Sequence, residues 1–318
     1  MEPTSNRLFT TSKDGKVCAW DANTCTLMSE VPMGAEIDSM LLFSGWLFVG
    51  INVREGYSVI RAIHLDTSAH QDMEGHTGQI YALATNERLL FSASQDTTIR
   101  VWQFDESSSV FGCVSVLKEH KGSVLCLAIA GDMLFSAGLD LTIKVWNLST
   151  GTLAQTIENA HREAVLSLAI WEGYLISGGL DGDVKIWAQS APGMATPLES
   201  NSMYTFPEPR DQNSSGSRNS RNRSHRNRSD RRYRDGVMAM CCTCDQNSAS
   251  PTPVLAVSYK NGIIGLWELP SFGDRGDVKY PKEAPSIPVR AVAAQVSHGV
   301  LFTGDSTGHV SVWKWKQT

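Results

Sequence analysis

Three stretches of the sequence repeat a set of His, Ser, Asp and Trp at fixed spacing. In each set the His lies 26 residues before the Trp, the Ser 10 before it and the Asp 6 before it. The sets are His76, Ser92, Asp96 and Trp102; His120, Ser136, Asp140 and Trp146; and His161, Ser177, Asp181 and Trp187. A hydroxyl nucleophile, an imidazole base and an orienting carboxylate are the groups that acyl transfer needs. One such set alone would suggest a hydrolase.

Repetition argues against that interpretation, because an enzyme needs one site whereas a repeated fold needs the same support in every repeat. A hydrogen-bond chain is the alternative: Trp donates through its indole N–H, Ser and neutral His donate and accept, and Asp accepts. Each such bond contributes about 0.5–1.5 kcal/mol net, and an unpaired buried partner costs more. We therefore predict three structural tetrads and no catalytic residue.

The tetrads belong to a longer repeat, in which an apolar run, a turn with Asp or Gly and alternating apolar residues lead to a Trp. The clearest copies read LLFSASQDTTIRVW, MLFSAGLDLTIKVW and YLISGGLDGDVKIW. With looser copies, and one in which Ala replaces Trp, the end positions are Trp20, Ala62, Trp102, Trp146, Trp187, Trp267 and Trp313. Steps near 40 residues between short strands are typical of four-stranded propeller blades. We predict an all-β, seven-bladed propeller in a single domain over residues 1–318.

The ends of the sequence affect how this propeller closes. Counting back 26 residues from Trp20 leads to a position before Met1, and only five residues follow Trp313. We expect the first blade to lack its inner strand and the seventh its outer strand, so the propeller is incomplete at the closure between them. We also expect the chain to be a shortened form of a longer protein.

The openings Gly75-His76 and Glu119-His120, each followed by a strand that ends in Trp, resemble the WD-repeat family. Only Trp20-Asp21 keeps the dipeptide for which that family is named. The last third is similar to the plant family that joins CCCH zinc fingers to a WD-repeat propeller. The residues that carry this similarity are Leu269-Pro270-Ser271-Phe272, Arg275-Gly276, Phe302-Thr303-Gly304-Asp305 and Val312-Trp313-Lys314-Trp315.

The second resemblance implies a zinc finger upstream of the propeller as the expected RNA contact. This sequence contains no finger: Cys18 and Cys25 are followed by no Cys or His at a usable spacing. The cluster Cys241, Cys242 and Cys244 also lacks a nearby second ligand pair, and zinc needs four ligands. We expect core or half-buried thiols, with Cys242 and Cys244 on one face of a strand, and we predict no metal and no cofactor.

The interval between the repeat ends Trp187 and Trp267 is 80 residues, about twice the usual length. Residues 210–235 lie in it, between an expected outer strand near residues 202–206 and an expected inner strand at 237–242. The segment carries nine Arg against three Asp, a local charge of +6 in a chain of net charge −5. Because it lacks apolar residues, we expect a disordered loop. Three roles stay open: a solvated loop, a contact with RNA or another polyanion, and a nuclear-import patch or phosphorylation switch. The candidate polyanion contacts are Arg218, Arg221, Arg223, Arg226, Arg228, Arg231, Arg232 and Arg234.

The residue before each turn Asp should lie on the face where propellers hold partners. This candidate partner face comprises Lys13, Gln95, Leu139, Leu180 and, by register, Lys260. Leu139 and Leu180 fall in adjacent blades, so they could anchor a partner peptide if they are exposed. The alternative is that loops shield both.

Composition excludes several classes. The longest mostly apolar stretch, residues 40–51, is too short for a membrane span, and the N-terminus lacks the pattern of a secretion signal. Seven Cys without a framework of spacings fit a reducing compartment. We expect an intracellular protein, with the nucleus favoured over the cytoplasm.

The function that these patterns favour is a non-enzymatic scaffold that binds other proteins, with no small-molecule substrate. One alternative is an RNA-associated regulatory protein whose basic loop contacts RNA. Another is a substrate receptor of a cullin-type ubiquitin ligase, which would carry Arg or Lys three residues after the Trp of an intact repeat. Those places hold Asn23, Asp105, Ser149, Ser190 and Pro270, and Lys316 follows a repeat with Thr307 in place of the acid.

Overall fold

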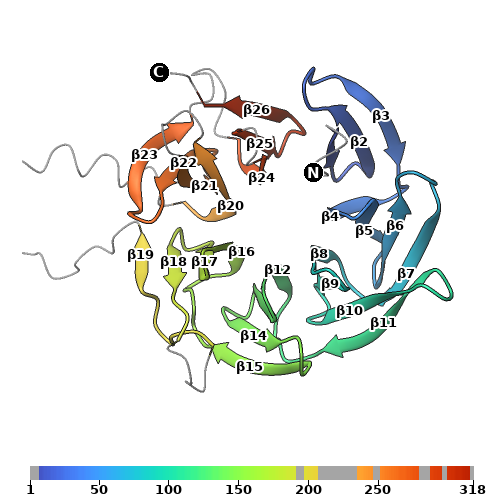
Figure 1. Ribbon diagram of the computed structural model, residues 1–318, viewed down its shortest axis with the longest axis horizontal. Coiled ribbons are helices and arrows are strands. Elements are labelled where there is room, and N and C mark those ends of the chain that lie inside the picture. The colour runs from blue at the N-terminus through green and yellow to red at the C-terminus, as the bar shows by residue number, and fades with distance from the viewer. Residues whose placement is uncertain are drawn as a thin grey trace, which may run out of the picture. The chain divides into compact units, whose positions relative to one another are not determined.

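The computed structural model describes residues 7–190, 197–206, 235–245, 251–278, 287–295 and 299–315. The chain divides into two compact units, residues 1–153 and 154–318, which are described separately below. Every regular element among the described residues is a β-strand (Figure 1). That part of the chain accordingly has no helix long and apolar enough to cross a membrane.

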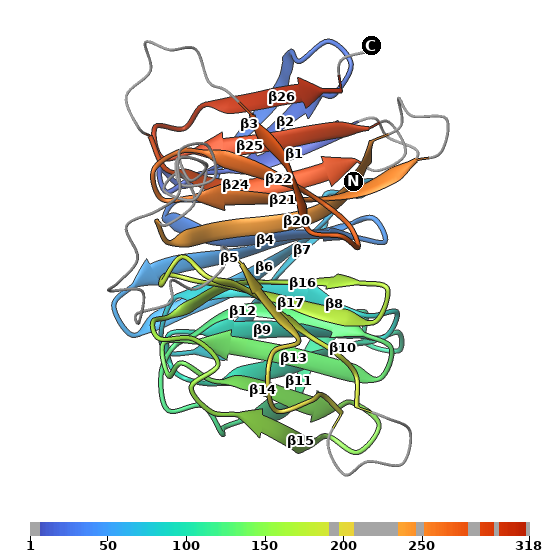
Figure 2. The ribbon, with the colours of Figure 1, turned by 90° about the vertical axis from the view of Figure 1, so that its left-hand side faces the viewer.

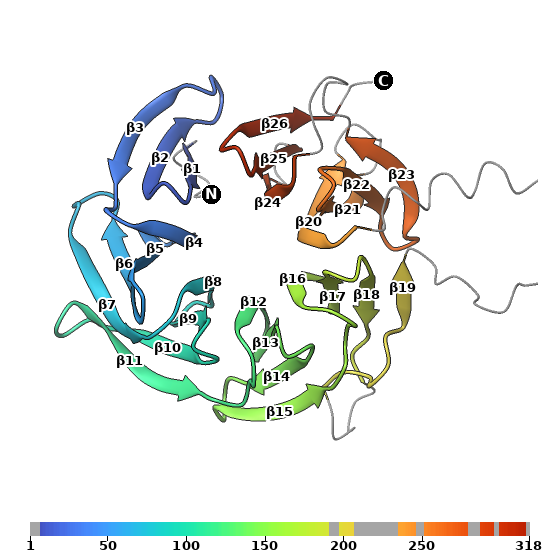
Figure 3. The same ribbon diagram turned by 180° about the vertical axis from the view of Figure 1, so that it is seen from behind.

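The strands of the first unit form consecutive antiparallel sheets, one for each sequence repeat. The first sheet consists of β1 (Arg7–Thr11), β2 (Lys16–Asp21) and β3 (Leu27–Pro32). The second consists of β4 (Glu36–Phe43), β5 (Trp46–Arg54), β6 (Tyr57–His64) and β7 (His70–His76). The third consists of β8 (Ile80–Thr85), β9 (Leu89–Ser94), β10 (Ile99–Asp105) and β11 (Val110–Leu117). Figure 3 shows these sheets from behind, in blue to green.

The fourth sheet consists of β12 (Val124–Ala130), β13 (Met133–Gly138), β14 (Ile143–Asn147) and β15 (Thr152–Ile157). In the second unit the fifth sheet holds β16 (Val165–Trp171), β17 (Tyr174–Gly179), β18 (Val184–Trp187) and β19 (Tyr204–Phe206). The sixth holds β20 (Val237–Asp245), β21 (Thr252–Tyr259), β22 (Ile264–Glu268) and β23 (Gly273–Val278). The seventh holds β24 (Val289–Gln295), β25 (Val300–Asp305) and β26 (Val310–Lys314). Figure 2 shows β20, β21 and β22 as neighbouring arrows.

These seven sheets confirm the predicted all-β class and the seven blades of a β-propeller. The first and seventh sheets have three described strands each. The Trp that ends the repeat lies on the second strand of the first sheet, where β2 holds Trp20, and on the last strand of the seventh, where β26 holds Trp313. In the complete third sheet the equivalent Trp102 lies on the third strand, β10.

The hydrophobic core lies between consecutive sheets, and the alternation along a strand decides which side each residue serves. On β10, Ile99 and Val101 belong to one buried cluster together with Val124 of β12. Trp102 belongs to a different buried cluster that contains Phe48 of β5. Because side chains alternate between the two faces of a strand, a single strand fills both the preceding and the following inter-sheet layer.

The innermost strand of each sheet from the second to the seventh contains a one-residue register shift against its neighbour. Such a shift is what a β-bulge produces, and it re-aims the side chain of the extra residue. The residue before each shift is a buried Ile or Val: Ile37, Ile80, Val124, Val165, Val237 and Val289. The extra residues are Asp38, Tyr81 and Leu125 in the first unit and Leu166, Met238 and Arg290 in the second.

Candidate functional site

The structure brings the four members of each predicted tetrad into one hydrogen-bonded chain. In the first unit, His76 Nδ1 lies 2.7 Å from Asp96 Oδ2, and His76 Nε2 lies 2.8 Å from Ser92 Oγ. The indole N–H of Trp102 donates to the same Ser92 Oγ at 2.8 Å. His76 is the last residue of β7, whereas the other three residues belong to the third sheet. The tetrad therefore ties two consecutive sheets together.

The other two tetrads repeat this geometry. The His–Asp, His–Ser and Trp–Ser distances are 2.7, 2.7 and 2.8 Å for His120, Asp140, Ser136 and Trp146. They are 3.1, 2.8 and 2.9 Å for His161, Asp181, Ser177 and Trp187. Each of these two His residues lies in the loop that enters its sheet.

The direction of every bond in a tetrad follows from the Trp. An indole can only donate, so Ser92 Oγ accepts from Trp102 and donates its own proton to His76 Nε2. The remaining ring proton of a neutral His76 is then on Nδ1, where it donates to the Asp96 carboxylate. A single neutral tautomer thus satisfies all four groups.

The Asp of each tetrad also holds the backbone of the turn. Asp96 accepts hydrogen bonds from the backbone N–H groups of Thr77 and Thr98 and from the Thr98 hydroxyl. Burial favours the neutral acid, but the hydrogen bonds from His76, Thr98 and the Thr77 backbone outweigh it, and the pKa of the Asp96 carboxyl lies below its ordinary value. Burial and His120 act in the same opposing way on the pKa of Asp140, which is also lowered.

Burial decides what this arrangement can do chemically. The hydroxyl-bearing residues Ser92, Ser136 and Ser177 are each 0% exposed. A nucleophile has to touch its substrate, and these hydroxyls are enclosed by the core and committed to the Trp and His of their own tetrad. The geometry supports a structural role for the three sets.

Two looser repeats keep a reduced form of the tetrad that the sequence reasoning did not identify. The Trp20 indole donates to Thr10 Oγ1 at 2.8 Å, and the Trp313 indole donates to Thr303 Oγ1 at 2.9 Å. Both Thr residues lie 10 positions before their Trp, the place of Ser in the full tetrads. That spacing was a usable signal, because Thr carries the same hydroxyl acceptor.

A basic residue two positions before the Trp is a second feature that the sequence analysis did not identify. Arg100 donates through Nη2 to the backbone oxygen of Gly75 at 2.8 Å, and Lys185 donates through Nζ to that of Ala160 at 2.6 Å. Each acceptor directly precedes a tetrad His. These long side chains therefore hold the backbone of the residue that precedes each tetrad His.

The candidate partner-face residues differ in exposure. Gln95, Leu139 and Lys260 are exposed, with 54% of Leu139 accessible to solvent, whereas Leu180 is half-buried. Lys13 Nζ lies 3.6 Å from Asp38 Oδ1, and the exposed fractions of their side chains are 72% and 6%. Burial raises the pKa of the Asp38 carboxyl, and Lys13 only partly offsets this.

The cysteine cluster lies on β20 and is half-buried. Cys242 packs against a buried cluster containing Leu255, and Cys241 against another containing Ala256, so the two point to opposite faces of the strand as expected. Burial raises the pKa of the Cys241 thiol to about 12 and that of Cys242 to about 11. Within the described ranges no group of three or more His, Cys, Asp or Glu could hold a metal ion.

The candidate polyanion contacts Arg218 to Arg234 lie outside the described residues, as does Lys316.

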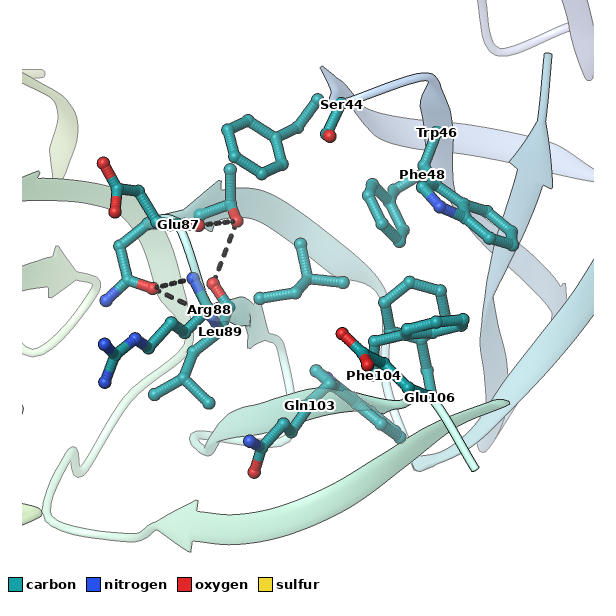
Figure 4. A pocket seen from close by; sticks show the side chains of 15 residues that line it. Ser44, Trp46, Phe48, Glu87, Arg88, Leu89, Gln103, Phe104 and Glu106 are labelled. Carbon is teal, nitrogen blue, oxygen red and sulfur yellow. Dashed lines mark hydrogen bonds between the residues drawn. The ribbon is translucent and has the colours of Figure 1, made fainter. Parts of the chain in front are cut away.

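A cavity of about 410 Å³ in the first unit was not predicted from the sequence. The β4–β5 turn, the β8–β9 turn and the end of β10 surround it (Figure 4). Aromatic side chains make up much of its lining, with Trp46, Phe48 and Phe104 on one side of the view and the Glu87–Leu89 segment on the other. No local sequence pattern predicts this cavity, because its lining residues are spread from position 43 to position 111.

The sequence and the structure are both similar to those of known proteins. A family described as "WD domain, G-beta repeat" matches residues 68–103, 111–147 and 151–188, the segments that hold the three tetrads. A computationally designed protein, Ika8, has a solved structure similar to this one, with a TM-score of 0.66. The match covers 98% of this chain and 81% of that protein at 20% sequence identity, and it shows the fold alone.

Three plant proteins are similar over nearly the full sequence. "Zinc finger CCCH domain-containing protein 17" of Oryza sativa subsp. japonica is 33% identical over 314 residues, which are 98% of this chain and 61% of the relative. "Zinc finger CCCH domain-containing protein 48" of Arabidopsis thaliana is 39% identical over 311 residues, 98% of this chain and 62% of the relative. "Zinc finger CCCH domain-containing protein 63" of the same plant is 39% identical over 317 residues, 98% and 61% respectively. These matches confirm the resemblance predicted from the last third of the sequence, and the chain spans about three fifths of these relatives' length.

Proposed function

We propose that the chain, whose repeats match the WD-repeat family model, is a scaffold that binds other proteins through the turns at the ends of its blades, without catalysis of its own. The observation that carries this proposal is the pairing of an exposed side chain with an immobilised turn. Leu139 directly precedes Asp140, whose carboxylate accepts bonds from His120, from the backbone of Lys121 and from Thr142.

A turn held in this way loses little conformational freedom when a partner binds, and such preorganisation favours affinity. An exposed leucine on the turn offers an apolar anchor, and Gln95 occupies the equivalent place beside Asp96. The Ser hydroxyls of the three tetrads have no exposed surface, so they cannot contact a substrate. This burial favours a role in which the tetrads fix the turns that a partner recognises.

The experiment compares the proteins captured from a plant extract by the wild-type chain, a Leu139→Ser variant and a matched control. Val114→Ser is a suitable control because Val114 is an exposed apolar residue, 56% accessible, on the outer strand β11. We expect the Leu139 variant to lose a defined set of partners that the control keeps, with or without RNase. Identical sets from both variants would contradict the proposal.

A second candidate function is RNA association, which two observations favour. The relatives are named for a CCCH zinc finger, and residues 210–235 carry a local charge of +6. If this function is correct, purified chain binds single-stranded RNA, and removal of residues 210–235 weakens that binding. The same basic segment supports a nuclear location, which a fluorescent fusion with and without residues 210–235 would test.

A further inference from the structure

We infer that the aromatic cavity between the β4–β5 and β8–β9 turns is a second docking site, which takes a bulky apolar side chain of a partner polypeptide that has a basic residue close by. The inference rests on the proposed function only in that the occupant is a protein. It concerns the opposite end of the strands from the candidate partner face, because β9 runs from Leu89 at the cavity to Ser94 beside Gln95.

The burial of the lining residues suits an apolar anchor. Phe48, Leu90 and Trp102 in the lining are buried, and Trp46 and Phe104 are half-buried. Ligand sites range over about 300–1,000 Å³, so a volume of about 410 Å³ suits one or two side chains better than a large cofactor. Phe43 stands in the lining with 37% of its surface exposed.

The packing of the aromatic rings argues against a cage for a cation. The ring centroids of Trp46 and Phe111 are 5.2 Å apart at an interplanar angle of 89°, and those of Phe48 and Phe111 are 5.3 Å apart at 84°. These are direct edge-to-face contacts, so the rings pack on one another and leave no space between them for an ammonium group. They present apolar surface on one side of the cavity.

The charges around the cavity indicate what accompanies the apolar group. Glu87, Arg88 and Glu106 are all exposed, and none of them forms an ion pair with another residue of the described ranges. Their net charge of −1 is unfavourable for a polyanion such as RNA and favourable for Lys or Arg. An apolar centre with a charged, solvated rim is the usual anatomy of a protein interface.

Local hydrogen bonds keep the opening in shape. The Thr85 hydroxyl donates to the Leu89 backbone oxygen at 2.9 Å, and Asn86 Oδ1 accepts from the backbone N–H groups of Arg88 and Leu89 (Figure 4). The Thr85 hydroxyl and the Asn86 amide oxygen are therefore satisfied within the turn. A ligand meets a preformed site, and one chain can hold a partner at each end of β9 at once.

Three acetylated pentapeptide amides test the site: Gly-Phe-Gly-Lys-Gly, the same peptide with Ala in place of Phe, and the same peptide with Glu in place of Lys. The protein carries 5-fluorotryptophan, and the Trp46 signal is assigned from a Trp46→Phe variant by ¹⁹F NMR. We expect a saturable shift of that signal with the Phe–Lys peptide. Affinity should fall at least about tenfold with Ala, from the lost apolar burial, and about two- to fivefold with Glu.

Variants and a control separate this site from the proposed partner face. Phe43→Ala should weaken binding of the Phe–Lys peptide, and Glu106→Lys should remove its preference over the Phe–Glu peptide. Leu139→Ala, at the other end of the blades, should change neither. Equal shifts with the Phe and Ala peptides, or a Trp46 shift produced by oligouridine instead, would overturn the inference. The capture experiment with Leu139→Ser tests the proposed function independently of this outcome.

Discussion

His76 Nδ1 and Asp96 Oδ2 are 2.7 Å apart although the residues are 20 positions apart in the chain. His76 ends the outer strand of the second sheet, and Asp96 lies in the turn after β9 of the third. This one bond therefore fixes how consecutive sheets connect. The same 20-residue offset joins His120 to Asp140 and His161 to Asp181.

Replacing Asp140 with Ala should lower the free energy of unfolding by about 1–3 kcal/mol, because His120 and the backbone N–H groups of Lys121 and Thr142 lose their acceptor. Asp96→Ala and Asp181→Ala should behave alike. Urea unfolding measures the change, and Asp140→Asn, which keeps one oxygen acceptor, is the milder control. If one of these variants abolished an activity and left stability intact, the structural role of that tetrad would be wrong.

Acid should destabilise the fold through the same carboxylates. Burial opposes their ionisation, but the bonds from the His rings outweigh it, so the pKa values of Asp96, Asp140 and Asp181 lie below the ordinary 3.8. A carboxyl with a lower pKa in the folded state stabilises the fold above its unfolded pKa and loses that contribution as pH falls below it. Unfolding measured from about pH 6 down to about pH 2 should show stability falling below about pH 4. Asp140→Asn should make that fall shallower, and an unchanged slope would contradict the assignment.

Asp38→Asn should stabilise the protein near neutral pH, by an amount on the order of 1 kcal/mol, the scale for a poorly satisfied buried polar group. Burial raises the pKa of Asp38 in the folded state, so its ionisation disfavours folding as pH rises through that value. The stabilisation of the variant should therefore vanish below about pH 4, where Asp38 is protonated in both states. Lys13→Met is the control, and it should destabilise by removing the counter-charge 3.6 Å away.

Deleting residues 210–235 should leave the thermal melt nearly unchanged, because the segment has no aliphatic residue and only one aromatic residue, Tyr233, that could add to a core. If the segment binds RNA, neutralising at most about six phosphates on a single strand gives a log–log salt slope no steeper than about −4. Filter binding at several salt concentrations measures it. Equal RNA binding by the deleted chain would remove this segment from the RNA proposal.

The seven blades could be predicted from the sequence because every blade repeats one arrangement of residues. Fixed offsets from Trp102 to Ser92, Asp96 and His76 predicted which groups meet, and the alternating apolar residues before each Trp predicted strands. The link between consecutive sheets could not be predicted, because the spacing does not show that His76 pairs with Ser58 in the β6–β7 ladder of the preceding sheet.

The cavity could not be predicted for a related reason. Trp46 and Phe111 meet only once two sheets have packed together, and they share no spacing that other blades repeat. A feature that occurs in one blade only produces no repeated spacing in the sequence. The reduced pairs Thr10–Trp20 and Thr303–Trp313 are the opposite case, because their 10-residue offset was present and only the change from Ser to Thr concealed it.

The register shift near the start of each innermost strand separates two kinds of sequence constraint. The residue before the shift is always a buried Ile or Val, so packing restricts it to branched aliphatic side chains. The extra residue has no cross-strand partner position, and its six occurrences are acidic, phenolic, aliphatic, aliphatic, thioether and basic: Asp38, Tyr81, Leu125, Leu166, Met238 and Arg290. Chemistry at these six places can change during evolution without repacking the core. Among relatives of this fold, variation should therefore accumulate there first whenever binding preference diverges.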